Sequence, residues 1–134
     1  MTYANAAADC ASRSGTLAMA TDTYTFETLR DVLTLYFWAE FDVYLSSGRI
    51  EDFPYGAAWV DGSDQLINTS VDGFYCATVG GACPDTMPWN TVNHIDPDRT
   101  SLPNCAKVTV ASLPDGLHDH QCNKKLVRIC DIPS

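Results

Sequence analysis

The segment NCAKVTVASLPDGLHDHQCNKKLVRIC, residues 104–130, carries three of the six cysteines of the chain. Sixteen residues separate Cys105 from Cys122, and seven separate Cys122 from Cys130. Polar and apolar residues alternate over residues 107–110, which predicts a half-buried strand directly after Cys105. Two cysteines that enclose such a strand would tie neighbouring strands together, and the remaining one would reach a distant partner.

The cysteine count indicates the compartment. An even number of cysteines in an acidic chain of 134 residues is typical of a disulfide-bonded protein in an oxidising environment. The glycosylation triplet Asn68-Thr69-Ser70 is compatible with the same route. We therefore expect a secreted, extracellular protein, and the length predicts one domain with a core of its own.

The charge excludes several classes of partner. A net charge of -9 argues against binding to nucleic acid or to an anionic membrane surface, because both need a basic footprint. No apolar run approaches the ~18 residues of a membrane span. Fourteen of the seventeen acidic residues are aspartates, which favour turns and loops. Loop carboxylates are the ligands that calcium uses, although most of these aspartates need only form solvated turns.

Local patterns predict an α+β order of elements. Thr2 can cap a helix over residues 3–13 that ends at Gly15, and a short strand over 16–19 follows. Apolar residues at helical spacing predict a second helix over 23–38. The mixed composition of residues 41–55 indicates a surface excursion or a short hairpin.

The rest of the chain reads as short strands around one long loop. Residues 57–60 predict a central strand with Trp59 in the core, and residues 73–76 predict a second short strand. Residues 77–104 contain four prolines and one pair of glycines, which mark irregular chain, and few apolar repeats. An irregular segment of this length in a compact domain is usually functional or disordered.

The order of these features resembles a C-type lectin-like domain. Trp89, a proline between two acidic residues, Cys105, an apolar strand, Asp119, Cys122 and a final Ile129-Cys130 follow one another as in that family. Residues 2–18 resemble its first helix and strand, and residues 58–62 resemble its central tryptophan-containing strand. The resemblance covers nearly all of the chain.

The resemblance implies a fold with two helices packed on small antiparallel sheets and a long irregular loop region. It also implies three disulfides, which join Cys10 to Cys130, Cys105 to Cys122, and Cys76 to Cys83. The spacing alone leaves all fifteen pairings of six cysteines open.

A binding site follows from the same resemblance. Domains of this family hold a calcium ion with a loop triplet and a later strand, and sugar hydroxyls complete the ion's shell. The matching positions here are Asp96-Pro97-Asp98 and His118-Asp119. The implied calcium ligands are Asp96, Asp98 and Asp119, with Asn104 as an additional carbonyl, and the implied ligand is a carbohydrate.

Departures from the family pattern leave alternatives open. His118 stands where the family has an asparagine, and Asp96 and Asp98 are both acceptors when ionised, whereas the family mixes a carboxylate with an amide. The chain could bind sugar without calcium, or these residues could only shape a loop. In that case we expect a module that binds a protein or a surface such as ice or a mineral.

Other chemistries have weaker support in the sequence. His118 and His120 would share one face of a strand and could take zinc with Asp119, although His94 is the only other histidine. Trp89 could stack on a sugar or pack the loop, and packing is the family's use. Pairing of all six cysteines would leave no thiol nucleophile, so no enzyme is predicted. A homo-oligomer would compensate for weak binding at a single sugar site.

Overall fold

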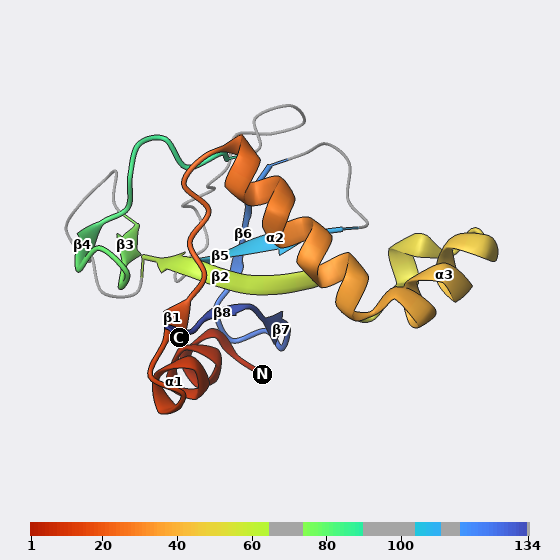
Figure 1. Ribbon diagram of the computed structural model, residues 1–134, viewed down its shortest axis with the longest axis horizontal. Coiled ribbons are helices and arrows are strands. Elements are labelled where there is room, and N and C mark those ends of the chain that lie inside the picture. The colour runs from red at the N-terminus through yellow and green to blue at the C-terminus, as the bar shows by residue number, and fades with distance from the viewer. Residues whose placement is uncertain (65–73, 90–103, 111–115, 134) are drawn as a thin grey trace.

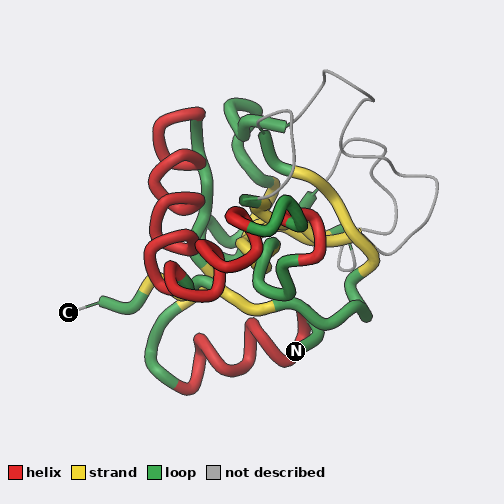
Figure 2. Tube along the Cα trace, turned by 90° about the vertical axis from the view of Figure 1, so that its right-hand side faces the viewer, coloured by secondary structure: helices red, strands yellow, loops and turns green. Residues whose placement is uncertain are grey.

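The computed structural model describes residues 1–64, 74–89, 104–110 and 116–133. Over these ranges the sheet lies between helix α1 (Tyr3–Ser12) on one side and helix α2 (Thr23–Tyr36) on the other (Figures 1 and 2). The architecture is the α+β arrangement expected from the sequence, with a third helix and several short strands in addition.

Helix α1 begins where predicted and ends differently. The Thr2 side chain accepts a hydrogen bond from the Asn5 amide and so caps the first turn. At the other end Ser14, not Gly15, takes the left-handed conformation, with φ of 64°. Gly15 serves a different purpose, because a Cβ there would lie 2.5 Å from the carbonyl oxygen of Asp131. Its missing side chain lets the end of α1 approach the last strand.

Helix α2 buries the face that its sequence predicts. The Asp22 carboxylate caps its first turn by accepting a hydrogen bond from the Thr25 amide at 2.8 Å. Phe26, Leu29 and Leu33 are buried against the sheet. Neither α2 nor any other described helix has the length and apolar composition needed to cross a bilayer.

The expectation for residues 41–55 was wrong in its hairpin form. Helix α2 ends at Tyr36, and helix α3 (Trp38–Ser46) and a 3-10 turn η1 (Ile50–Asp52) follow. No residue of α3 is buried, and the helix projects away from the sheet (Figure 1). A helix that covers no core lacks the one-sided apolar pattern by which helices are recognised in a sequence.

The sheet is organised around β2 (Ala57–Ser63). In the described residues its strand order is β4-β3-β2-β5-β6, and β7 pairs with the first half of β2 in parallel. The other strands are β3 (Tyr75–Cys76), β4 (Gly81–Ala82), β5 (Asn104–Thr109), β6 (His118–Gln121) and β7 (Val127–Arg128). A separate pair joins β1 (Thr16–Leu17) to β8 (Cys130–Asp131), which places both at the base of the molecule.

The two faces of β2 bury two apolar clusters. Ala58 and Val60 lie in a cluster with Phe26 and other residues of α2. Trp59 points to the opposite face, where it packs against α1 and is fully buried. Its indole N–H donates to the Met1 carbonyl at 3.0 Å, and its ring meets the Tyr3 ring edge-on. The prediction that Trp59 is a core residue is confirmed.

All six cysteines lie in the described residues and are paired as the resemblance implied. Cys10 to Cys130 ties α1 to β8, Cys105 to Cys122 ties β5 to the end of β6, and Cys76 to Cys83 closes the β3–β4 turn. The bridge between Cys105 and Cys122 therefore fixes β5 and β6, the two strands that carry the described part of the predicted site.

Candidate functional site

The described part of the predicted site lies on β5 and β6. Asn104 opens β5, and His118 and Asp119 open β6. The triplet Asp96-Pro97-Asp98 falls in residues 90–103, outside the described residues. The residues that flank that segment, Trp89 and Asn104, are described, and they define the base of the predicted loop that carries the triplet.

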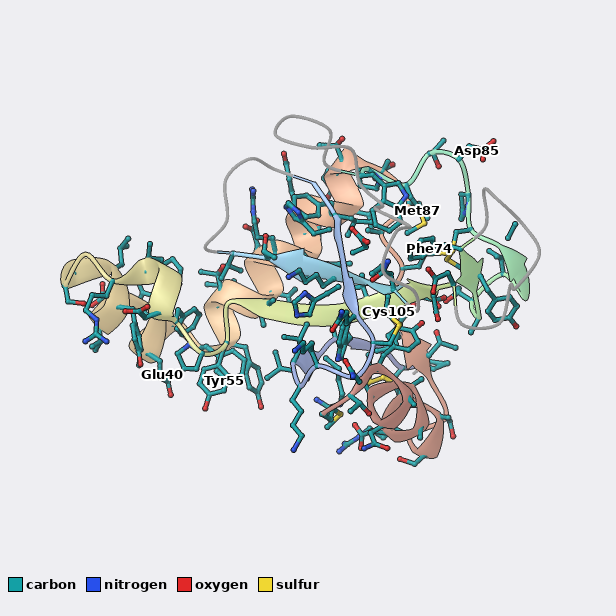
Figure 3. All side chains as sticks on the ribbon, turned by 180° about the vertical axis from the view of Figure 1, so that it is seen from behind. Glu40, Tyr55, Phe74, Asp85, Met87 and Cys105 are labelled. Atoms are coloured by element: carbon teal, nitrogen blue, oxygen red, sulfur yellow. A yellow bond between two sulfur atoms is a disulfide. The ribbon has the colours of Figure 1, made fainter. Side chains whose placement is uncertain are left out.

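Trp89 anchors the first end of this loop. It forms a bridge with Leu117, whose amide donates to the Pro88 carbonyl at 2.8 Å. Its ring packs edge-on against Phe74, with centroids 5.0 Å apart, in the region where Phe74 and Met87 lie close together (Figure 3). Partly buried against the α2 cluster, Trp89 packs the loop base.

Asn104 anchors the second end through Asp64, a residue that sequence reasoning missed. The Asn104 amide donates to Oδ1 of Asp64 at 2.7 Å, and the Asp64 amide donates to the Asn104 carbonyl at 3.0 Å. Both residues are buried. Forty positions separate them in the chain, so only the pairing of β2 with β5 brings them together.

The second carboxylate oxygen of Asp64 is the chemically open group at this base. Asp64 is 5% exposed, and its Oδ2 atom has no hydrogen-bond partner among the described residues. A buried carboxylate oxygen without a donor is costly. A cation would remove that cost, and hard oxygen atoms are what calcium takes. The chemistry of this atom therefore fits the calcium site that the resemblance implies.

Asp61, three residues earlier on β2, is a buried carboxylate in which both oxygens have a hydrogen-bond donor. It is 1% exposed, and its two oxygens accept hydrogen bonds from the amides of Ala77 and Thr78 at 3.0 and 2.8 Å. These bonds hold the turn after β3 against the sheet. Asp61 is therefore a structural residue, whereas Asp64 retains binding capacity.

His118 and Asp119 do not act from the same face of the sheet. Side chains alternate along a strand, so consecutive residues point to opposite faces. Asp119 pairs with Ala106, on the α2 face, and shares that face with Asn104. His118 pairs with Lys107, on the face that contains Trp59. Of the predicted pair, Asp119 is thus the residue on the side of Asn104.

The zinc hypothesis gains no geometric support. His118 and His120 share a face, but Asp119 lies on the other one. Nδ1 of His120 lies 3.3 Å from the Lys107 ammonium nitrogen. Burial, with the Lys107 and Lys124 charges, holds the pKa of His120 below its usual value. Over the described residues, no three histidine, cysteine or acidic side chains are grouped to hold a metal ion.

Comparison with known proteins shows the fold. No protein-family model matches the chain, and no curated protein matches it. Among solved structures, the carbohydrate-recognition domain of the mouse scavenger receptor C-type lectin aligns with a TM-score of 0.61 and 14% identity, over 96% of this chain and 78% of that one. TC14, a C-type lectin from the tunicate Polyandrocarpa misakiensis, aligns with a TM-score of 0.60 and 18% identity, over 97% and 88%.

Proposed function

We propose that this chain, which has the C-type lectin-like fold, is a secreted carbohydrate-binding protein that recognises sugar hydroxyls with the help of calcium. The observation that carries the proposal is the buried Oδ2 atom of Asp64, which lacks a donor among the described residues and lies at the base of the 90–103 loop. We further propose that the chain is one domain and acts as a binder rather than an enzyme.

The residues that would hold the ion are acidic and come from three segments. Asp96 and Asp98 belong to the loop, Asp119 to β6, and Asp64 to the end of β2. Asn104 completes the set with carbonyl oxygens. When bound, calcium supplies coordination positions that sugar hydroxyls can fill.

The protein's own contribution is to fix these oxygens before the sugar arrives. The Cys105 to Cys122 bridge holds β5 and β6 in register, and the hydrogen bonds between Asp64 and Asn104 fix the end of the loop. A preorganised site loses less conformational entropy on binding. His118 lies on the opposite face from Asp119, so any contribution of His118 to sugar binding would be separate from that of the calcium ligands.

Binding of the chain to immobilised glycans tests the proposal. We expect retention in calcium, loss of retention with a chelator, and loss in the Asp98→Ala and Asp119→Ala variants. Asp31→Ala, which removes an exposed carboxylate from α2, is the matched control and should bind like the wild type. Retention that survives the chelator would support sugar binding without calcium. No retention on any glycan would favour a protein- or surface-binding module.

Two buried aspartates, Asp61 on β2 and Asp64 directly after it, give a second test, by stability. With a chelator present to remove calcium, Asp61→Asn should lower the free energy of unfolding by about 2 to 3 kcal/mol, because one of the two backbone amides loses its acceptor. Asp64→Asn should change the free energy of unfolding by less than about 1 kcal/mol, because the amide oxygen keeps the bond from Asn104 and the uncompensated charge is removed. Urea titrations measure both values.

Calcium then separates the roles of the two residues. At roughly 100 times its dissociation constant, calcium should stabilise the wild type and Asp61→Asn by about 2.7 kcal/mol each. Calcium should stabilise the Asp64→Asn variant by clearly less than this amount. Equal gains in all three proteins would show that Asp64 is not a ligand.

A further inference from the structure

Six large apolar side chains are exposed within one stretch of fourteen residues at the junction of α2 and α3. We call them the α2–α3 patch: Val32, Leu35, Tyr36, Trp38, Val43 and Leu45, with exposed fractions of 46, 71, 81, 53, 65 and 51%. Single exposed apolar residues need no explanation, whereas a concentration of them marks an interaction surface.

Aromatic contacts hold the region of helix α3 to the body. Phe41 and Tyr44 contact the Phe53 ring, and Phe37 stacks on Tyr55 with centroids 4.1 Å apart. Glu40 of α3 and Tyr55 lie in this projecting part of the molecule (Figure 3). A nine-residue helix is marginal in water without tertiary packing. Its exposed apolar side chains Trp38, Val43 and Leu45 therefore remain available to a partner.

A groove adjoins the patch. It has a volume of about 390 Å³ and lies between the end of α2 and the strands β7 and β8. Val32 and Tyr36 of the patch form one wall, and residues 127–130 form the other. The surface thus combines a projecting helix with a hollow beside it, which is the shape that a self-complementary contact requires.

The size of the patch matches a dimer interface. Its six side chains expose on the order of 700 Å², above the ~300 to 600 Å² of the largest patch on a typical monomer. A standard interface buries about 800 Å² per partner.

Charge on the two halves of this surface is complementary. Glu40 and Asp42 are exposed on α3. Lys124 and Lys125 are exposed just before β7, whose residues line the groove. In a two-fold arrangement each acidic helix would meet the basic side of the other copy's groove. Such complementarity favours one register and raises the association rate.

We propose that the α2–α3 patch is the interface of a symmetric homodimer in which helix α3 of each copy lies against the groove of the other. The second copy covers the apolar side chains that the isolated chain leaves in water. This inference is independent of calcium and of sugar binding, because the patch contains none of the proposed ligands.

Sedimentation velocity on the purified chain between about 1 and 100 µM tests the dimer. We expect a species of twice the 14.6 kDa mass of the chain. Leu35→Glu and Val43→Glu should each weaken dimerisation by about 30-fold or more, as expected for residues near the centre of an interface. Tyr24→Glu, at a position on α2 that is 78% exposed and outside the patch, is the matched control and should leave the dimer unchanged.

Circular dichroism of each variant checks that the fold is retained, which surface positions allow. A monomer at every concentration would overturn the proposal, as would a dimer that both patch variants leave intact. A monomer that instead floats with phosphatidylcholine vesicles, and loses this property in Leu35→Glu, would assign the patch to a lipid surface and also overturn it.

Discussion

Replacement of both Cys10 and Cys130 by alanine is expected to lower the free energy of unfolding by about 4 to 5 kcal/mol. The bridge spans 120 positions, so its loss releases nearly the whole unfolded chain from a constraint. Alanine is the suitable replacement because Cys10 is fully buried and a serine hydroxyl would lack a partner there. Urea-induced unfolding under non-reducing conditions measures the loss.

The bridge between Cys105 and Cys122 provides the matched control. It spans 17 positions, and removal of both sulfurs should cost about 3 kcal/mol. The difference in loop length thus predicts that the free energies of unfolding of the two double variants differ by roughly 1.5 to 2 kcal/mol. Equal losses would mean that packing around the sulfurs, rather than chain entropy, determines the contribution of each bridge.

Trp59→Ala is expected to lower the free energy of unfolding by about 3 to 5 kcal/mol, which is a large part of the stability of a typical domain. The side chain is fully buried between α1 and β5, and its loss leaves a cavity that the disulfide-bound strands cannot close. The Met1 carbonyl also loses the indole donor. The midpoint temperature of thermal unfolding should fall by roughly 10 to 20 °C.

Val110→Ala is a useful comparison for this variant. Val110 packs at the edge of the α2 cluster and is only partly buried, so its truncation should cost about 1 kcal/mol. A Trp59→Ala protein that unfolds at the same temperature as Val110→Ala would contradict the assignment of Trp59 to the centre of the core.

The proposed sugar site and the proposed dimer together predict stronger binding to surfaces that display many sugars. A single sugar site is weak, and two sites on one dimer would raise the apparent affinity for a surface that displays many copies of the sugar. None of the residues of the α2–α3 patch is a proposed calcium or sugar ligand, so the dimer contact and the sugar contact can be altered separately. Leu35→Glu should therefore lower retention on dense glycan surfaces while leaving binding to a free monosaccharide unchanged.

The sequence predicted those parts of the fold that depend on local or covalent constraints. Thr2 marks the start of α1 because its hydroxyl satisfies an amide that is only three residues away. The buried face of α2 follows from apolar spacing, with Phe26, Leu29 and Leu33 at helical intervals. The pairing of the cysteines came from the family resemblance, since spacing left fifteen choices.

Other features depended on contacts that no local pattern contains. Helix α3 was expected as a hairpin or excursion, because a helix that covers no core has no one-sided apolar pattern to reveal it. Ser14 rather than Gly15 took the left-handed position, because the approach of β8 required the glycine one residue later.

The sequence by itself determined that this chain is acidic and rich in cysteine, and that it begins with a helix and contains a buried tryptophan strand. Tertiary structure alone decided that Asp64 meets Asn104, and that His118 and Asp119 point to opposite faces of β6. The reason is physical. The periodicity of apolar residues and the number of cysteines can be read from the sequence, whereas the register of β2 against β5 is fixed only when their side chains pack together.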